Sequence, residues 1–427
     1  MVKSYSEILD RVKRHSAVVL TAEEVSRLAE RGETSALEQV DVVTTATRAV
    51  MSGTYAVLSF PVAGPGEFLR AKKVFINGIE ANVGPCPNEN LGVLDVVIFG
   101  TAHSRSRPNY GGGHLFRELV EGKKVQVEVE TDAGKALQAE VGLEDMPHAR
   151  LFGSRHAFKN YSAFINPSER SVRTIFHARE FEPGCREATF SGCGQINPLK
   201  NDPLLETIGM GTRILLNGAE GFVLGTGTRS TPERPNLSGF ADMHQMLPEY
   251  MGGFVTSAGP ECIVSWAVPI PVASETVLQE IVRQDSQIPL PVMDVVTRNA
   301  IGKSDYGCVW RDVDLEVEFD AGECRGCTCC QVEMTCPMKA VRFGERSAKR
   351  DEMLCFHCGL CVTQCPSAAF RCRLGSIQLK TPSGDDRCIP VVLRQSDRLR
   401  AIKLAEELKR RILEGSFKMA QPLERIS

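Results

Sequence analysis

The sequence contains no hydrophobic run long enough to cross a membrane. The longest mainly apolar stretch, residues 263–273, is interrupted by Ser265, Pro269 and Pro271, whereas a spanning helix needs roughly 20 apolar residues. An excess of positive charge is also absent, because 50 Lys and Arg stand against 53 Asp and Glu and the net charge is -3. Without concentrated positive charge, nonspecific binding to a phosphate backbone is weak. We therefore expect neither a membrane span nor a nucleic-acid partner.

The N-terminal residues lack the apolar core and the small-residue cleavage site of a signal peptide, so we expect a cytoplasmic protein.

Cysteine, by contrast, is abundant, with 16 in 427 residues. In a reducing compartment so many thiols indicate metal or redox chemistry rather than structural disulfides. Ten of them lie between Cys324 and Cys372. The distribution predicts a cysteine-dense segment joined to a larger, ordinary domain.

Two cysteine runs share one spacing pattern. The second run has the CxxCxxCxxxCP spacing that wraps a cubane iron–sulfur cluster, and consists of Cys355, Cys358, Cys361 and Cys365 before Pro366. The first run repeats it with a longer third interval, and consists of Cys324, Cys327, Cys330 and Cys336 before Pro337. Together the runs resemble the bacterial two-cluster ferredoxins, in which the fourth cysteine of each run ligates the other cluster. The resemblance implies two [4Fe–4S] clusters, one on Cys324, Cys327, Cys330 and Cys365 and the other on Cys355, Cys358, Cys361 and Cys336.

A pair of zinc sites is the alternative reading of these runs, because CxxC pairs also build tetrahedral thiolate sites. Eight cysteines with two Cys-Pro endings favour the cluster pattern. Cys329, Cys372 and Cys388 fit no cluster interval, and we treat them as non-ligands.

The fold class expected is α+β: a mixed α/β domain over residues 1–320, a two-cluster ferredoxin domain over 321–375, and a C-terminal strand and helix over 376–427. Helices are predicted at 6–15 and 21–32, the second with Thr21 as N-cap and Glu24 completing a capping box. Short β-branched or alternating runs predict strands at residues 40–45, 55–60, 73–76, 94–99, 124–130 and 213–216.

Three sequence echoes suggest an internal repeat. Residues 75–80 are echoed at 215–220, with Asn-Gly hairpin signals in both. Residues 49–54 are echoed at 188–193, and 100–109 at 225–236. We therefore expect pseudo-equivalent halves near 40–140 and 180–270 that face a shared cleft, with Cys193 in the place that Thr54 holds in the first half. Chance similarity of turn motifs is the alternative.

Two cysteines outside the runs are candidate catalytic thiols. Cys193 lies between Gly192 and Gly194, which permit a tight turn and close approach of a ligand. Neighbouring amides would lower its thiol pKa, as a nucleophile requires. A packed structural cysteine is the competing reading. Cys86, in a Pro-Cys-Pro loop, is the second candidate. Apolar neighbours make Cys262 and Cys308 packing residues in this interpretation.

A basic, glycine-rich stretch at residues 100–114 leads from a predicted strand into a predicted helix. Backbone amides at such a helix start, here at Gly112 and Gly113, bind anions. Arg105 and Arg107 would add bidentate contacts to a carboxylate or sulfonate. The stretch also supplies two candidate acid–base groups, His103 and His114. A surface loop with structural histidines is the competing interpretation.

Five motifs, at residues 40–47, 75–78, 110–114, 191–194 and 252–262, resemble the archaeal and bacterial homocysteine-biosynthesis protein family. With the ferredoxin-like runs, the chain is similar to the branch called methanogenesis marker 16 metalloprotein. The resemblance covers nearly all of residues 1–320. It implies an activity like that of aspartate semialdehyde sulfurtransferase, in which an aldehyde, sulfide and two electrons give a thiol. The homocysteine branch carries its key cysteine in the stretch matching residues 50–53, where this chain has none; we expect Cys193 to substitute for it.

The expected function is reductive sulfur insertion into a small anionic aldehyde, either sulfoacetaldehyde to give coenzyme M or L-aspartate semialdehyde to give homocysteine. In this hypothesis Cys193 carries a persulfide, and the clusters pass on electrons from an external low-potential donor. A sulfide or persulfide donor and assembly as a homo-oligomer are also expected. The alternative is an electron-transfer subunit of a larger redox complex.

Overall fold

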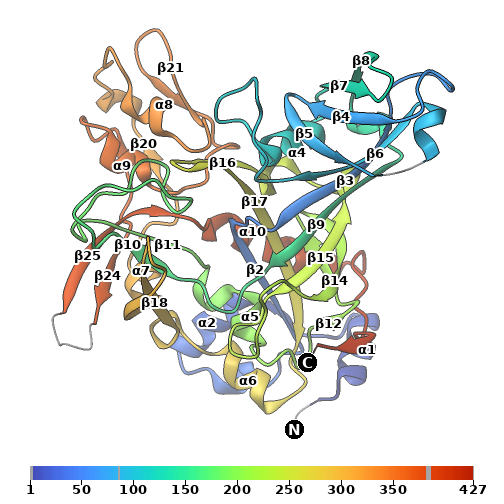
Figure 1. The fold of residues 1–427 in the computed structure, drawn as a ribbon. Coiled ribbons are helices and arrows are strands. Elements are labelled where there is room, and N and C mark those ends of the chain that lie inside the picture. The colour runs from blue at the N-terminus through green and yellow to red at the C-terminus, as the bar shows by residue number, and fades with distance from the viewer. Residues whose placement is uncertain (1–2, 85–86, 381–385, 427) are drawn as a thin grey trace.

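A computed structural model describes residues 3–84, 87–380 and 386–426 and is built on two large β-sheets (Figure 1). The first sheet has fourteen strands. Their order is β1 (Val19–Thr21), β2 (Val42–Val50), β17 (Gly259–Pro271), β13 (Arg213–Leu216), β14 (Ala219–Thr226), β15 (Leu237–Asp242), β9 (His148–His156), β3 (Thr54–Pro61), β6 (Val93–Phe99), β5 (Ile79–Val83), β4 (Ala71–Ile76), β7 (Val125–Thr131) and β8 (Ala136–Val141), with β16 (Gly252–Thr256) paired to β17.

The second sheet has six strands, in the order β19 (Ala300–Asp305), β18 (Pro289–Asp294), β10 (Ala163–Ile165), β11 (Ala188–Phe190), β25 (Arg387–Arg394) and β24 (Ser376–Leu379). Three further pairs are short: β12 (Gly209–Met210) with β26 (Glu424–Arg425), β20 (Glu318–Phe319) with β23 (Phe370–Arg371), and β21 (Val341–Phe343) with β22 (Ala348–Arg350). The helices are α1 (Tyr5–Lys13), α2 (Ala22–Glu30), α3 (Thr34–Leu37), α4 (Gly112–Val120), α5 (Pro198–Asn201), α6 (Glu275–Ile281), α7 (Gly307–Trp310), α8 (Gln331–Thr335), α9 (Leu360–Gln364) and α10 (Arg398–Leu413). The mixed α and β class is confirmed.

The predicted N-terminal elements form where the sequence places them. Thr21 caps α2, because its Oγ1 accepts from the Glu24 amide at 3.1 Å and the Glu24 carboxylate accepts from the Thr21 amide at 2.7 Å. This reciprocal pair satisfies two of the donors that a helix start leaves free. All six predicted strands are present as β2, β3, β4, β6, β7 and β13, and the helix expected after residue 114 is α4.

The interrupted apolar stretch at 263–273 lies mostly in β17, which is an interior strand of the first sheet. It pairs with β2 in an unbroken antiparallel register from Ile263↔Val50 to Pro271↔Val42. Residues 260–271 of β17 are all buried, because both faces of this strand are covered. In a sequence, a strand that is covered on both faces appears as a continuous apolar run. This explains why residues 263–273 are mainly apolar. No helix in the part of the chain that the structure describes is long and apolar enough to cross a membrane.

The two Asn-Gly hairpins of the expected repeat have the same hydrogen-bond pattern. The Asn77 amide donates to the Gln126 carbonyl at 2.8 Å, and the Asn77 Oδ1 accepts from the Gln126 amide at 3.0 Å. Asn217 makes the same two bonds with Ser265, at 2.8 and 2.9 Å. The strand order is also the same outward from the β3–β9 pair, as β6-β5-β4-β7 on one side and β15-β14-β13-β17 on the other. The structure therefore contains the hairpin part of the predicted repeat.

The upstream echo does not follow this symmetry. Residues 49–54 end β2 and begin β3 in the first sheet, whereas Ala188–Phe190 is β11 in the second sheet. The expectation that Cys193 holds the place of Thr54 is therefore wrong. Short Ser-Gly turns recur for local reasons, and their resemblance did not reflect a shared position in the fold.

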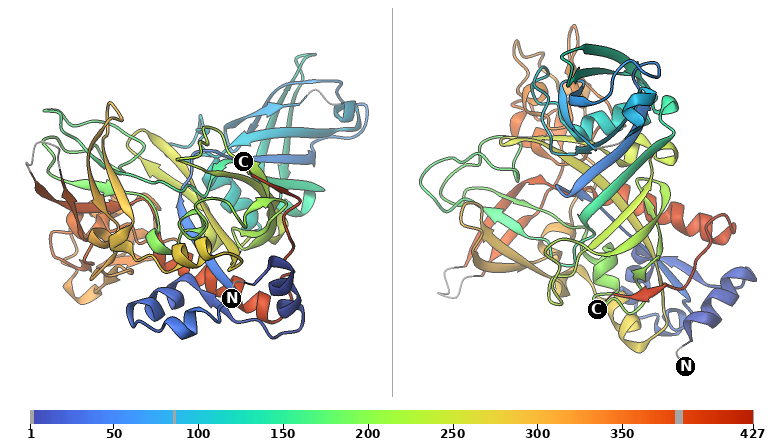
Figure 2. Two further views of the ribbon diagram at one scale, coloured as in Figure 1. Left: turned by 90° about the horizontal axis from the view of Figure 1, so that it is seen from below. Right: turned by 45° about the vertical axis from the view of Figure 1, so that its right-hand side comes forward.

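The cysteine-rich segment is inserted between parts of the second sheet. Strands β24 and β25 follow the segment, yet β25 pairs with β11, and both strands share a hydrophobic core with β10, β11 and β18. Helix α10 then packs on β2, β17 and β1 and lies beside α1 and α2 in the left view of Figure 2. Residues 376–427 therefore complete the larger part of the molecule rather than trailing behind the insert.

A buried ion pair joins the first sheet to α10. Arg48, in β2, and Asp397, the N-cap of α10, have fully buried side chains, and the Arg48 Nε lies 3.2 Å from the Asp397 Oδ2. The Arg48 Nη1 also donates to the Ser265 Oγ at 3.0 Å. Burial lowers the pKa of Arg48 to about 10, and Asp397 opposes that shift. The guanidinium therefore stays charged at neutral pH.

Replacing Asp397 by Asn keeps the shape of the side chain but removes the charge that compensates Arg48. We expect the free energy of unfolding to fall by about 3–5 kcal/mol, because breaking a buried pair leaves an uncompensated charge in the core. Chemical denaturation under anaerobic conditions measures the change. The matched control is Glu128→Gln, which opens the exposed Arg105–Glu128 pair and should cost about 0–1 kcal/mol. Equal losses in the two variants would contradict the importance of the buried pair.

Candidate functional site

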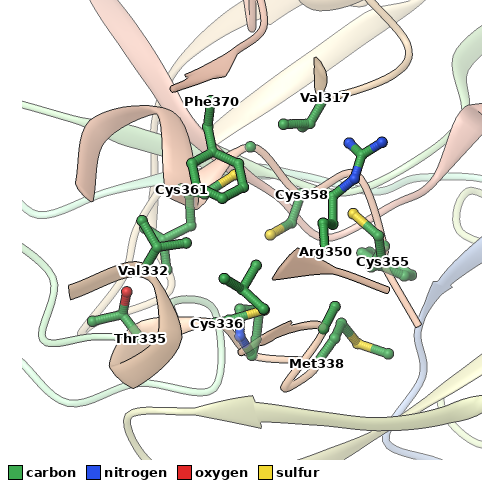
Figure 3. A pocket seen from close by; sticks show the side chains of 16 residues that line it. Val317, Val332, Thr335, Cys336, Met338, Arg350, Cys355, Cys358, Cys361 and Phe370 are labelled. Atoms are coloured by element: carbon green, nitrogen blue, oxygen red, sulfur yellow. The ribbon is translucent and has the colours of Figure 1, made fainter. Parts of the chain in front are cut away.

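The eight cysteines of the two runs line two separate cavities. The first cavity is lined by Cys324, Cys327, Cys330 and Cys365. The second is lined by Cys336, Cys355, Cys358 and Cys361, which surround it in Figure 3. We call these sets the first and second quartets. Each quartet takes one cysteine from the other run, which is the grouping that the ferredoxin resemblance implies. Among the described residues, no group of three or more His, Cys, Asp or Glu side chains is arranged to hold a metal ion.

The second quartet packs directly on the first sheet. Phe254 of β16 and Ile263 of β17 share an apolar cluster with Phe356 and Cys358. The Val255 amide, in β16, donates to the Pro337 carbonyl at 2.8 Å, beside Cys336. Burial raises the pKa of Cys355 to about 11 and also raises that of Cys358. The second quartet thus packs against the larger domain, with Cys358 buried and the other three cysteines partly buried.

Arginines from α10 and β2 fix the quartet in this place. Both terminal nitrogens of Arg400 donate to backbone carbonyls of the segment, Nη1 to Cys355 and Nη2 to Glu352, at 2.5 Å each. The Arg48 guanidinium lies over the Phe356 ring, 5.3 Å from its centroid. The ion pair that joins β2 to α10 therefore also contacts the quartet.

Cys193 lies in the core and not in a cleft. Its side chain is fully buried, and its Sγ is 3.8 Å from the Arg48 carbonyl oxygen. Gly192 and Gly194 do have positive φ angles, 106° and 61°, but the space beside them is filled by the side chains of Tyr306, Tyr161, Asp285 and Trp310. Burial raises the pKa of Cys193 to about 11. The expected lowering of its pKa is therefore wrong, and its role as a sulfur carrier stays a prediction.

The amides of the 100–114 loop are already bonded within the protein. The Gly112 amide donates to the Ala102 carbonyl at 3.0 Å, and the Gly113 amide to the Gly100 carbonyl at 2.9 Å. A Cβ on Gly112 would meet the Phe99 carbonyl, and one on Gly113 the backbone of Gly252. These glycines permit close packing of α4 against two strands, so the expectation of an open anion site at their amides is wrong.

Arg105 and Arg107 point to acidic partners on the surface. The Arg105 Nη2 is 2.7 Å from the Glu128 Oε2, with the guanidinium stacked on Phe75. The Arg107 Nη1 is 3.8 Å from the Glu118 Oε2. Both side chains are half exposed. The structure brings neither arginine to Cys193, and each already has a counter-charge.

The two candidate histidines differ in burial. His103 packs against Gly259, at the start of β17. His114 is largely buried against Gly253, and its Nδ1 accepts from the Gly111 amide at 3.2 Å. Burial lowers the pKa of His114 to about 4, so this ring is neutral at physiological pH. Cys86, the remaining candidate, lies outside the described residues.

Comparison with known families matches residues 17–419 to the family described as homocysteine biosynthesis enzyme, sulfur-incorporation. The chain belongs to this family. A Methanothermobacter thermautotrophicus protein described as uncharacterized is 45% identical over 415 residues, covering 97% of this chain and 94% of its own length. A second such protein, from Methanocaldococcus jannaschii, is 40% identical over 403 residues, covering 94% of this chain and 98% of its own. No solved structure matches the chain.

Two further relatives carry the name of an enzyme. The L-aspartate semialdehyde sulfurtransferase of Methanocaldococcus jannaschii is 31% identical over 310 residues, 69% of this chain and 59% of that protein. The enzyme of the same name from Methanosarcina acetivorans is 31% identical over 314 residues, 71% of this chain and 60% of its own. The matched part is thus about three fifths of these enzymes. The resemblance to the homocysteine family is confirmed, while the ferredoxin-like segment and the marker branch stay predictions.

Sequence reasoning missed the surroundings of the turn at residues 51–54, where the resemblance places the family's cysteine. The Met51 amide donates to the Cys262 carbonyl at 2.7 Å, and the Ser154 amide to the Gly53 carbonyl at 2.8 Å. Both the Ser52 side chain and the Arg155 charge act to lower the pKa of the Glu261 carboxyl. In the sequence, the Gly-Pro-Glu-Cys motif was the available signal, but nothing in it indicates that Glu261 meets a turn about 210 residues earlier.

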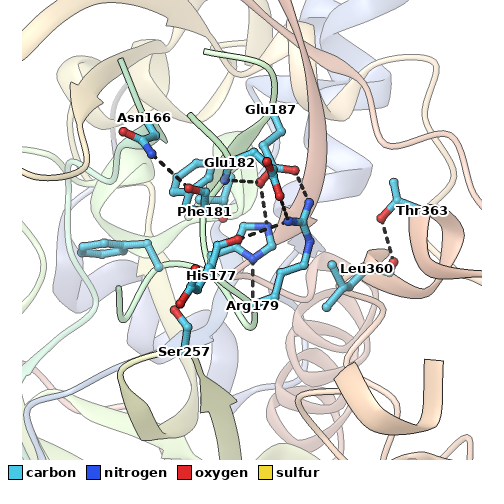
Figure 4. A network of polar contacts seen from close by, with 12 residues as sticks. Asn166, His177, Arg179, Phe181, Glu182, Glu187, Ser257, Leu360 and Thr363 are labelled. Carbon is cyan, nitrogen blue, oxygen red and sulfur yellow. Dashed lines mark hydrogen bonds and ion pairs between the residues drawn. The ribbon is translucent and has the colours of Figure 1, made fainter. Parts of the chain in front are cut away.

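A buried polar network holds the segment between β10 and β11 near the second quartet (Figure 4). Arg179 bonds to Glu187 at 2.5 Å and to Glu182 at 3.0 Å. The His177 carbonyl accepts from the Ser257 amide at 2.8 Å, and burial lowers the pKa of His177 to about 3. The next residue, Ala178, packs in the apolar cluster that includes Cys336. The network therefore holds a segment that packs near Cys336 of the second quartet.

The burial of Cys193 predicts slow alkylation. A pKa of about 11 leaves about one thiol in a thousand ionised at pH 8, against roughly a quarter for an ordinary thiol. In native protein, iodoacetamide should therefore modify Cys193 at least about 100-fold more slowly than the exposed Cys388, as peptide mass spectrometry would measure. Similar rates would show that Cys193 is accessible and activated.

Proposed function

We propose that the chain catalyses reductive sulfur incorporation into a small anionic aldehyde. In this reaction an aldehyde, hydrogen sulfide, two electrons and two protons give a thiol and water. Sulfoacetaldehyde, leading to coenzyme M, and L-aspartate semialdehyde, leading to homocysteine, are the two candidate substrates. The observation that carries the proposal is the packing of the second quartet against the ends of β2 and β17, beside the turn at residues 51–54.

The two quartets are suited to [4Fe–4S] clusters. Four cysteines line each cavity, and the walls between them are largely apolar. A cubane takes one thiolate on each of four irons. When bound, such clusters supply single electrons at potentials down to about −700 mV. The first quartet would hold one cluster and the second quartet the other.

The burial of Cys193 favours free sulfide as the sulfur source. A neutral, enclosed thiol is a poor acceptor for sulfur, because the thiolate is the reactive form. A persulfide on Cys193 or Cys86 is the second route. It would raise the demand to four electrons, since persulfide sulfur is two electrons more oxidised than sulfide. A one-sulfur mass adduct on either cysteine, lost in Cys193→Ala or Cys86→Ala, would establish this route.

Metal analysis gives one test. The anaerobically purified chain should contain about eight irons and eight acid-labile sulfides, because eight thiolates satisfy two cubanes. Cys365→Ser should remove the electron paramagnetic resonance signal of the first-quartet cluster, although Cys365 belongs to the second run. The control Cys329→Ser, beside Cys330 but outside both cavities, should keep both signals. Zinc without sulfide would contradict the assignment.

Product analysis gives the other test. Reduced protein incubated with sulfide, titanium(III) citrate and each aldehyde should form a thiol that mass spectrometry detects after derivatisation. Cys358→Ser should abolish this product, whereas Cys388→Ser, at an exposed position outside both quartets, should keep normal turnover. No thiol from either aldehyde, with both clusters loaded, would overturn the proposed function.

A further inference from the structure

The carboxyl group of Glu261 is buried without full hydrogen bonding. Only 5% of the residue is exposed, and among the described residues its Oε2 has no hydrogen-bond partner. Buried polar atoms are nearly always paired, so an unpaired one calls for an explanation such as an absent ligand. Among the described residues, Glu261 takes part in no ion pair and in no group of side chains that could hold a metal ion. Its free oxygen therefore indicates a place that a ligand completes.

Strand pairing places this carboxyl on the side of the sheet that meets the second quartet. Glu261 lies directly opposite Phe254 in the β16–β17 pair, and paired residues point to the same face. Ile263, two residues along β17, also points to that face. Phe254 and Ile263 both pack in the apolar cluster with Cys358. Glu261 thus lies next to side chains that pack against the second quartet. In the sequence, however, it is far from the four cysteines of that quartet.

Two arginines that form no close ion pair among the residues that the structure describes lie beside the same turn. Arg155 is the last but one residue of β9, and its backbone and Cβ pack against Gly53. The Thr228 amide, one residue before Arg229, donates to the Ser154 carbonyl at 2.7 Å. Within the described chain, neither Arg155 nor Arg229 forms an ion pair, and their charges repel each other. A small anion would relieve this repulsion, in contrast to Arg105 and Arg107, which already have glutamate partners.

We propose that Ser52, Arg155, Arg229 and Glu261 form the binding site for the anionic aldehyde. Arg155 and Arg229 hold its carboxylate or sulfonate, and Glu261 faces the carbonyl oxygen with Ser52. This inference rests on the proposed function and names its substrate site. It replaces the site expected at Arg105, Arg107 and the amides of α4.

The first chemical step balances without any redox change. The sulfur of hydrosulfide bonds to the carbonyl carbon, and the π electrons of the carbonyl move to its oxygen. That oxygen takes the proton of the Glu261 carboxylic acid. The products are a 1-hydroxy thiol, RCH(OH)SH, and the Glu261 carboxylate. Loss of water and addition of two electrons and two protons then lead to the thiol.

The surroundings of Glu261 suit a proton donor. Burial raises its pKa to about 6, while the Ser52 hydrogen bond and the Arg155 charge oppose the rise. Arg155, from β9, is the charged group that acts on this carboxyl, and the opposite residue on β16 is the apolar Phe254. A general acid is most effective when its pKa is near the working pH. The acid form is lost as pH rises through about 6, so the rate of sulfur addition, measured at a fixed concentration of hydrosulfide, should fall there.

The test uses unreactive ligands, so that binding is measured apart from turnover. Isethionate and L-homoserine are the alcohols that correspond to the two aldehydes, and calorimetry with the full cluster-loaded chain measures their Kd without reductant. Arg155→Ala should weaken binding of the preferred alcohol at least about 10-fold. The matched control Arg105→Ala removes an arginine that Glu128 already neutralises and should leave Kd within about twofold.

Glu261→Gln separates proton donation from a structural role. This variant keeps the shape of the side chain, so it should bind the alcohol within about threefold of the wild type. Its thiol formation should be slower, and the fall in rate between pH 5.5 and 7.5, measured at a fixed concentration of hydrosulfide, should disappear. An unchanged pH profile would overturn the assigned role of Glu261.

Failure of the site and failure of the function give different results. If the wild type forms thiol but Arg155→Ala binds like Arg105→Ala, the proposed site is wrong and the function stands. If binding depends on Arg155 but no thiol forms, the site stands and the proposed reaction is wrong. If the loaded wild type binds neither alcohol, the site is overturned directly.

Discussion

The buried ion pair between Arg48 and Asp397 is the contact on which the assembly of this molecule depends. Arg48 lies in β2 of the first sheet, and Asp397 begins α10. The same guanidinium lies over Phe356, within the second cysteine run. Because both charges are removed from water, separating β2 from α10 would leave each charge without compensation. One electrostatic constraint thus couples the sheet, the C-terminal helix and the cysteine-rich insert.

This coupling explains why the second quartet belongs to the larger domain. The insert leaves the second sheet after β19 and returns to it at β24, so both of its ends are anchored. Arg400 adds hydrogen bonds to the backbone around Cys355. A redox group in this position would have a fixed distance from the turn at residues 51–54, whereas a ferredoxin on a flexible linker would sample many distances. With the proposed clusters in place, this architecture would deliver electrons to one site.

Glycines misled the sequence interpretation in two places for one physical reason. A missing Cβ permits close approach, but the sequence does not show whether a ligand or another part of the chain approaches. At Gly192 and Gly194 the neighbours are Tyr306 and Asp285, and at Gly112 the neighbour is the backbone of Phe99. Each of these close approaches is made by the protein itself. The residues that retain unsatisfied charge or hydrogen-bonding capacity, Arg155 and Glu261, carry no such local signal.

The sequence alone determined the features that depend on local spacing. These include the capping box of α2, the six predicted strands, the two Asn-Gly hairpins and the cysteine intervals of the two runs. Only the tertiary structure decided which distant segments meet. It buried Cys193 beside Arg48, placed the second quartet against the first sheet, and brought Glu261 to the turn at residue 52. Local backbone preferences act over a few residues, whereas burial and charge compensation depend on strand order and packing that no short pattern in the sequence specifies.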